Sequence, residues 1–382
     1  MKIVRACSYL CVFVWISLGC SVAPSQQPIN QVHQNTRKPQ DPVGPFSYQI
    51  KEVSYRNENA RATLAGTLTT PAGDGLFPAV LLITGSGPQN RDEEVFGHKP
   101  FWVIADYLTR QGIAVLRVDD RGVGGSTRRG APLTATSFDF AEDVEAGISF
   151  LRTQREIDPA SIGLIGHSEG GMIAPIVAAR DPRVAFIILL AGPGVPCEQL
   201  LLRQDELMLR ASGASEEEIA QSRVGQKAIF EIVLNEELKP ENANNQIREI
   251  IEAMPELNQD TDASFQRDNR EKLIGKISSP WFKTFLRYDP QPTLSQVTCP
   301  VLAINGELDL QVSCEENLEG IATALNQGGN SDTTIQSFPQ LNHPLQHCKT
   351  GQISEYAQID ETISEEVLVL VAAWITERFI EK

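Results

Sequence analysis

The segment that decides the fold is Gly166-His167-Ser168-Glu169-Gly170, which follows an apolar run at residues 162–165 and precedes a helix-like stretch. On a sharp turn between a strand and a helix a serine is held exposed, and flanking glycines let backbone segments approach without Cβ clashes. Ser168 would begin the helix, where the N–H of Glu169 is free to bind an oxyanion. For this segment taken alone, the alternative is a glycine-rich turn between a strand and a helix that has no catalytic role.

Two downstream segments supply a carboxylate and an imidazole. Residues 299–309 form an apolar stretch that ends in a turn carrying Asp309, and residues 333–338 alternate like a strand that leads to His343. A serine hydroxyl is a poor nucleophile until a base removes its proton, and the base needs a carboxylate to fix its tautomer. We therefore expect Ser168 to be the nucleophile, His343 the base and Asp309 the acid that orients it.

Some alternatives for the base and the acid stay open at this level. Three of the five histidines are set aside as candidates for the base because of their positions. His33 lies in the leader, His98 precedes the serine in the chain, and His167 stands directly beside it. His347 lies four residues after His343 and is the rival base, while Glu307 is the rival acid.

From residue 46 to its end the chain resembles the α/β-hydrolase superfamily, specifically serine esterases grouped with prolyl-oligopeptidase-like and dienelactone-hydrolase-like members. Five segments carry the resemblance in the family's order: residues 85–92, 117–126, 166–170, 306–312 and 341–343. It implies the roles given above for Ser168, Asp309 and His343. It also implies ester hydrolysis through an acyl-enzyme, without a cofactor.

The resemblance also gives expectations for two glycine-rich loops, residues 85–92 and 117–126. Similar enzymes carry His-Gly after the third strand, where this chain has Thr84-Gly85, so the backbone N–H groups of Ser86 and Glu169 are the expected oxyanion donors. A plain turn is the alternative for the first loop. The second, residues 117–126, is expected to be structural, with Asp119 and Arg121 forming a local ion pair.

The pattern of the remaining chain predicts an α/β architecture. A hairpin at residues 48–55 and 61–69 is followed by strands that alternate with helical segments, which indicates a doubly wound, mostly parallel sheet. Residues 197–288 are rich in charged helix formers and predict a helical cap insertion, which divides the hydrolase domain into residues 46–196 and 289–382. Trp281, Phe282 and Phe285 are expected to line an acyl pocket or to belong to the core.

Composition narrows the function further. With 382 residues and 41% hydrophobic residues, the chain can form one large α/β domain with an insertion. A net charge of −16 and an isoelectric point near 4.8 argue against nucleic-acid binding. The histidines and cysteines lack metal-ligand spacing, so no metal is expected.

The first residues predict export. Residues 1–19 have a basic start and an apolar core too short to span a bilayer, and they end before Cys20. The segment resembles a bacterial lipobox, which implies a lipidated Cys20, a flexible tether over residues 20–45 and a membrane-anchored protein of the cell envelope. A plain signal peptide, giving a soluble periplasmic or secreted protein, is the alternative.

The remaining cysteines suggest a covalent brace. Once Cys7, Cys11 and Cys20 are removed or lipidated, four of the seven remain: Cys197, Cys299, Cys314 and Cys348. Cys314 follows Asp309 and Cys348 follows His343, so we expect a Cys314–Cys348 disulfide between the acid and base loops, with two separate thiols as the alternative.

The sequence therefore predicts a serine hydrolase of small to medium carboxylic esters. A serine peptidase or thioesterase of the same fold is one alternative. A non-catalytic, membrane-tethered binding protein is another.

Overall fold

The computed structural model describes residues 37–127, 134–253 and 263–380. The expected signal segment and Cys20 lie outside these residues. Within them, the structure has no helix with the length and apolar character needed to span a bilayer.

In the described residues the strands form one eight-stranded sheet with the order β1-β2-β4-β3-β5-β6-β7-β8. β1 pairs antiparallel with β2, and β2 pairs antiparallel with β4, whereas every later pairing is parallel. The predicted hairpin and the doubly wound, mostly parallel sheet are thus confirmed. The strands are β1 (Tyr48–Asn57), β2 (Ala62–Pro71), β3 (Phe77–Ile83), β4 (Ala114–Val118), β5 (Ile157–His167), β6 (Ile187–Leu190), β7 (Val301–Gly306) and β8 (Thr333–Phe338).

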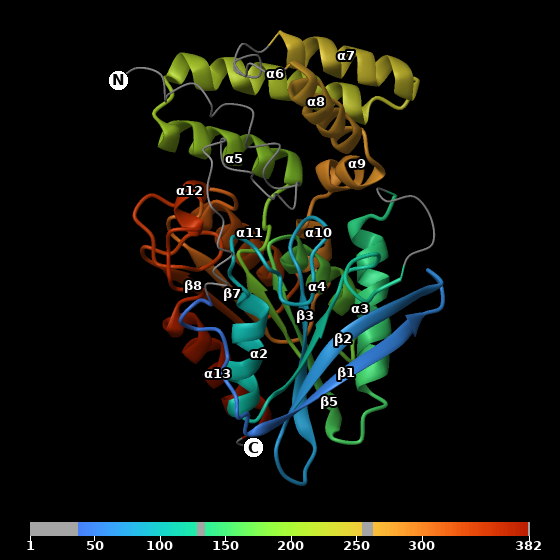
Figure 1. Cartoon of the computed structure of the whole chain (residues 1–382), viewed down its shortest axis with the longest axis vertical. Coiled ribbons are helices and arrows are strands. Elements are labelled where there is room, and N and C mark those ends of the chain that lie inside the picture. The colour runs from blue at the N-terminus through green and yellow to red at the C-terminus, as the bar shows by residue number, and fades with distance from the viewer. Residues whose placement is uncertain (1–36, 128–133, 254–262, 381–382) are drawn as a thin grey trace, which may run out of the picture.

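Helices cover both faces of the sheet (Figure 1). Alternate strand residues point to opposite faces, so Leu81 packs into the cluster that contains Ile148 and Ile321, while Leu82 packs with Leu108 and its neighbours. One face is covered by α2 (Pro100–Arg110) and α13 (Glu365–Phe379), and the other by α3 (Ser137–Leu151), α4 (Glu169–Arg180) and α11 (Cys314–Gln327). The short helices are α10 (Gln291–Leu294) and α12 (Ile353–Tyr356).

Between β6 and β7 the described chain is helical. These inserted helices are α5 (Cys197–Ser212), α6 (Glu216–Leu234), α7 (Pro240–Glu252), α8 (Ala263–Ile277) and α9 (Pro280–Arg287). They lie together at one end of the molecule, beyond the sheet and on the side where α4 begins (Figure 1). Their apolar side chains join the same core cluster as α4, so the insertion packs onto the sheet rather than standing apart from it.

Two expectations about contacts are wrong. Asp119 pairs with Arg91, and Arg121 instead bonds Asp143 through Nε at 2.6 Å, because α3 brings an acidic face beside the loop. The expected disulfide is absent: among the described residues Cys314 and Cys348 are both free thiols.

The acid and base loops are joined by backbone hydrogen bonds instead. Leu308 N donates to Leu341 O at 3.0 Å, and Glu307 N donates to Phe338 O at 2.9 Å. Cys348 Sγ donates to Gln340 O within its own turn, while Cys314 is buried at the start of α11. The two thiols therefore have different surroundings and do not pair with each other.

The glycines of the turn at Ser168 are required by close packing. A Cβ on Gly166 would collide with the carbonyl oxygen of Gly170, and a Cβ on Gly170 would collide with that of Ile83. Helix α4 therefore begins directly against the ends of β3 and β5. Residues larger than glycine at positions 166 and 170 would not permit so close an approach.

We expect Gly170→Ala to destabilise the fold by about 2–3 kcal/mol, because a rigid backbone carbonyl must move to admit the methyl group. Thermal unfolding measures the effect. Gly275→Ala is the matched control, since Gly275 is exposed in α8 with open space around its Cβ position. The control should be neutral or stabilising by up to about 1 kcal/mol, and equal melting temperatures for the two variants would refute the packing argument.

Candidate active site

Ser168 occupies a strained backbone position between β5 and α4. Its φ is 54° and its ψ is −117°, in a region that residues with a side chain rarely adopt. Two hydrogen bonds hold it there: Ser168 N donates to Leu190 O of β6, and Gly171 N donates to Ser168 O, both at 2.9 Å. The turn therefore presents the serine side chain at the start of α4.

Asp309 and His343 meet at the ends of β7 and β8. His343 Nδ1 lies 2.8 Å from Asp309 Oδ2, and the Asp309 side chain is completely shielded from solvent. The backbone N–H groups of Gln311 and Val312 donate to Asp309 Oδ1 and fix the carboxylate. The carboxylate accepts a hydrogen bond from the N–H at Nδ1, which leaves Nε2 as the nitrogen available to a hydroxyl.

The rival base and acid lie elsewhere. His347 is exposed and its Nδ1 pairs with Glu361 at 2.9 Å, while Glu307 accepts a hydrogen bond from Ser337. His98 is buried between Thr362 and the carbonyl of Tyr356 and tethers the C-terminal segment. The structure thus brings together His343 and Asp309, and it does not bring His347 or Glu307 to that pair.

The expected oxyanion donors lie beside Ser168. Ser86 follows β3, Glu169 begins α4, and both line the same cavity as Ser168. Within the described chain, neither backbone N–H donates a hydrogen bond to another protein group. Two unpaired N–H groups, one in the loop after β3 and one at the start of α4, suit a developing negative charge.

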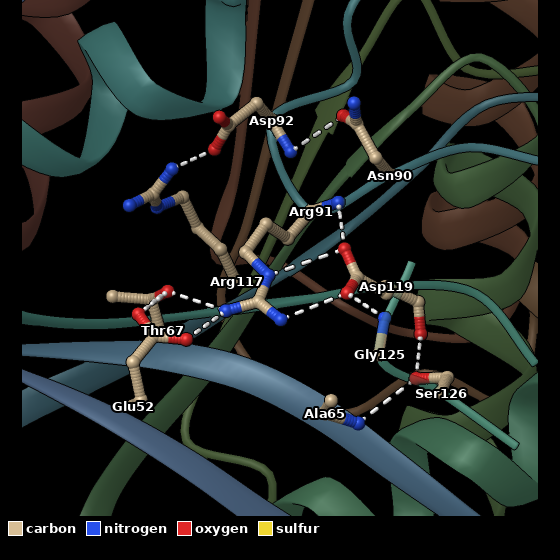
Figure 2. A network of polar contacts seen from close by, with 10 residues as sticks. All are labelled: Glu52, Ala65, Thr67, Asn90, Arg91, Asp92, Arg117, Asp119, Gly125 and Ser126. Carbon is tan, nitrogen blue, oxygen red and sulfur yellow. Dashed lines mark hydrogen bonds and ion pairs between the residues drawn. The ribbon is translucent and has the colours of Figure 1, made fainter. Parts of the chain in front are cut away.

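A buried ion-pair network holds the loop that carries Ser86 (Figure 2). Asp119 accepts hydrogen bonds from Arg91 N at 2.8 Å, from Arg91 Nη2 at 2.8 Å and from Gly125 N at 2.9 Å. Burial alone would raise the pKa of Asp119, but the bonds from Arg91 and Gly125 outweigh it and lower that pKa. Arg117 pairs with Asp92 alongside. The network therefore fixes the loops after β3 and β4 to each other and to the hairpin.

Sequence reasoning missed a second acid–histidine pair beside the first. His167 Nδ1 lies 3.0 Å from Glu93 Oε1, and His167 Nε2 lies 3.1 Å from the carbonyl oxygen of His343. A carboxylate and a carbonyl oxygen both accept hydrogen bonds, and this arrangement favours the doubly protonated, cationic ring of His167. Burial opposes this charge, but the Glu93 carboxylate and the His343 carbonyl outweigh burial and raise the pKa of His167.

The same Glu93 oxygen accepts a hydrogen bond from Gly85 N at 2.6 Å. Glu93 thereby connects the loop of Ser86 to His167, and His167 connects to the backbone of His343. The polar segment of residues 89–94 was the available signal in the sequence, although it did not reveal which acid would reach inward.

Ser168 stands between two cavities. The first, the insertion-side cavity, spans about 750 Å³ of space, part of it open to solvent, and is lined by Ser86, Glu169, Gln226 of α6 and several residues of α5, α8 and α9. The second, the histidine-side cavity, spans about 1890 Å³, also partly open to solvent, and is lined by His167, His343 and the loop after β3. Ser168, Ser86 and Gln311 line both cavities, so the serine lies where they meet.

The side chain of Glu169 is part of the insertion-side wall. It is 2% exposed and accepts hydrogen bonds from Ser137 Oγ at 2.6 Å and Trp281 Nε1 at 2.8 Å. Lys276 lies over the Trp281 ring at 5.1 Å, and burial lowers its pKa to about 8 although Glu169 partly offsets the effect. Trp281, Phe282 and Phe285 line the cavity and also join the core.

The described residues contain no cluster of three or more His, Cys, Asp or Glu side chains that could hold a metal ion.

Comparison with known proteins agrees with this geometry. The fold and the site define an α/β hydrolase. The chain belongs to the family described as serine aminopeptidase, S33, whose model matches residues 101–347 and therefore includes Ser168, Asp309 and His343.

Several individual proteins are similar. Esterase EstD of Thermotoga maritima is 27% identical over 332 residues, which cover 84% of this chain and 68% of EstD. A hypothetical protein of Pseudomonas aeruginosa, PA2218, shares the fold with a TM-score of 0.55 at 15% identity, covering 93% of this chain and 100% of that one. The Pyrococcus furiosus esterase Pf2001 does so with a TM-score of 0.53 at 16% identity, covering 90% and 97%. The protein is thus an esterase-like hydrolase.

We expect His167→Gln to move the acid limb of the pH profile of kcat/KM upward by about 1 pH unit. The His167 and His343 rings lie 4.8 Å apart, so a positive charge on one ring opposes a positive charge on the other. Removing the His167 cation while the Glu93 carboxylate remains takes this repulsion away, so activity is lost at a higher pH.

The matched control is His347→Gln, which removes an exposed histidine paired with Glu361 and should leave the profile in place. An unchanged acid limb in His167→Gln, or a shift to lower pH, would show that His167 carries no charge that acts on His343.

Proposed function

We propose that the protein is a serine carboxylic ester hydrolase that works through an acyl-enzyme on Ser168. The observation that carries the proposal is the position of Ser168, which lies on a strained turn and lines the same cavity as His343, itself oriented by Asp309.

In the first step His343 Nε2 takes the proton of Ser168 as Oγ attacks the ester carbonyl. The described residues provide no hydrogen bond to that hydroxyl, and such contacts often tighten only when substrate binds. The negative charge that develops on the carbonyl oxygen is stabilised by the N–H groups of Ser86 and Glu169, aided by the positive end of the α4 dipole.

The two cavities suit the two halves of an ester. His343 must return its proton to the departing alcohol, so the leaving group lies in the histidine-side cavity. The acyl group then occupies the insertion-side cavity, which is apolar along most of its wall. Water that enters from the histidine side hydrolyses the acyl-enzyme by the same steps, with His343 as base.

The inserted helices act in this scheme as the cap domain that selects the acyl group, since they form most of its wall. A largely apolar cavity beside Ser168 suits the body of a small to medium acyl group. The similarity to esterase EstD supports an ester substrate. The peptidase and thioesterase alternatives use the same triad, so a parallel screen of carboxylic esters, thioesters and peptide amides separates them.

Export and lipidation of Cys20 are part of the proposal. They are supported by the basic start and apolar core of the first residues and by the tether-like composition of residues 20–45. A lipid anchor would place the domain at a membrane surface of the cell envelope.

We expect Ser168→Ala to abolish ester hydrolysis and labelling by a fluorophosphonate without loss of fold, and His343→Ala to do nearly the same. Members of a triad act as one unit, with losses on the order of 10⁴ to 10⁶ in kcat. Asp309→Asn should lose less than Ser168→Ala.

Steady-state kinetics and circular dichroism measure these effects. His347→Ala is the control and should retain activity, since His347 is exposed and paired with Glu361. Activity retained in His343→Ala but lost in His347→Ala would assign the base to His347. Folded wild-type protein that neither hydrolyses any ester nor reacts with the fluorophosphonate would instead support the binding-protein alternative.

We expect wild-type protein to partition with membranes and to incorporate labelled palmitate, and Cys20→Ala to stall processing or to release the protein to the soluble exported fraction. Two or three acyl chains bind far more firmly than one, so partial release is not expected. Cys11→Ala, which leaves Cys20 in place, is the control. Soluble wild-type protein whose mature chain starts at another residue would refute lipidation.

A further inference from the structure

We propose that the acyl group of the substrate carries a hydroxyl on an otherwise apolar body, and that Gln204, Asp205 and Gln226 bind this hydroxyl in the insertion-side cavity. The inference rests on the proposed ester hydrolysis and names the class of acyl group.

Most of the cavity wall suits an apolar body. Leu273, Phe282 and Phe285 are buried residues of the wall, and Trp281 stacks on Phe285 with ring centroids 5.5 Å apart. An aromatic or branched aliphatic acyl group would bury its apolar surface against these side chains, which favours binding.

The wall is interrupted by three buried polar side chains on neighbouring helices. Gln204 and Asp205 on α5 and Gln226 on α6 line the cavity, and each residue is only 4% exposed. Side chains of this kind are seldom so deeply buried without hydrogen-bond partners.

Their hydrogen-bonding capacity is incompletely used. Gln226 Nε2 donates to Leu201 O at 3.3 Å, but Gln226 Oε1 has no partner among the described residues. Asp205 Oδ2 accepts a hydrogen bond from Ser222 of α6, and the amide of Gln204 makes no hydrogen bond within the described chain. An unsatisfied buried polar group destabilises the protein, so a ligand that pairs with these groups removes that penalty.

A hydroxyl is the group that fits all three. It donates to Gln226 Oε1 or to Asp205, and it accepts from the Gln204 amide. A carboxylate would be repelled by Asp205, and an ammonium group would be repelled by Lys276, which lines the same cavity. Asp205 is 4% exposed, and burial raises its pKa to about 6.

Matched pairs of nitrophenyl esters test the assignment. In each pair the acyl group carries a ring hydroxyl or a methyl group of similar size: 4-hydroxyphenylacetyl against 4-methylphenylacetyl, and 3-(4-hydroxyphenyl)propanoyl against 3-(4-methylphenyl)propanoyl. The quantity measured is the ratio of kcat/KM for the hydroxyl ester to that for the methyl ester. We expect wild-type protein to give a ratio of at least about 10 for one pair, because one hydrogen bond to a buried group is worth about a factor of ten.

Gln226→Leu removes the unpaired acceptor at nearly constant volume and should bring that ratio close to 1. Gln221→Leu makes the same change at an exposed position of α6 and should leave the ratio as in the wild type. If Gln226→Leu does not fold, Gln204→Leu serves in its place and should lower the ratio in the same way.

A wild-type ratio near 1 for both pairs overturns the inference, as does a ratio that survives both Gln226→Leu and Gln204→Leu. These outcomes require measurable hydrolysis of the esters. If the wild type hydrolyses none of the four and is not labelled by a fluorophosphonate, the proposed ester hydrolysis itself is refuted.

Discussion

The left-handed backbone of Ser168 is the constraint on which the other features of the site depend. A φ of 54° at a residue with a side chain is unfavourable, and it persists because the bonds to Leu190 and from Gly171 hold the turn on both sides. The same turn brings α4 against the end of β3, which only Gly166 and Gly170 permit. One strained residue thus fixes the positions of the proposed nucleophile, the helix start and one proposed oxyanion donor together.

The rest of the site is positioned by buried charges. Asp119 and Arg91 hold the loop that carries Ser86, and Glu93 joins that loop to His167 and, through it, to the backbone of His343. The proposed base and a proposed oxyanion donor therefore share one electrostatic framework. A Glu93 carboxylate paired with a cationic His167 adds no net charge beside Ser168.

The sheet and the approximate positions of Ser168, Asp309 and His343 could be predicted, because strand periodicity and turn chemistry are local and side chains at the ends of parallel strands meet. The contact of Glu93 with His167 spans 74 positions and depends on the path of a loop that local patterns do not determine. The predicted ion pair between Asp119 and Arg121 was wrong for the same reason. The partner of Arg121 is Asp143, which lies on a helix that packs beside it. The Cys314–Cys348 bridge failed because nearness in sequence to two paired residues does not set Cβ geometry.

The aromatic residues of α9 show why a pocket is hard to separate from a core by sequence. Phe282 and Phe285 belong to the core cluster and also line the cavity. The same apolar side chain can pack against the core on one side and face a cavity on the other. Polar residues within such a surface are more informative. Gln204 and the unpaired oxygen of Gln226 would not stabilise a protein core, whereas in a binding site they can form hydrogen bonds with a ligand. In the proposed function the loops at the strand ends therefore carry out the reaction, and the inserted helices select the substrate.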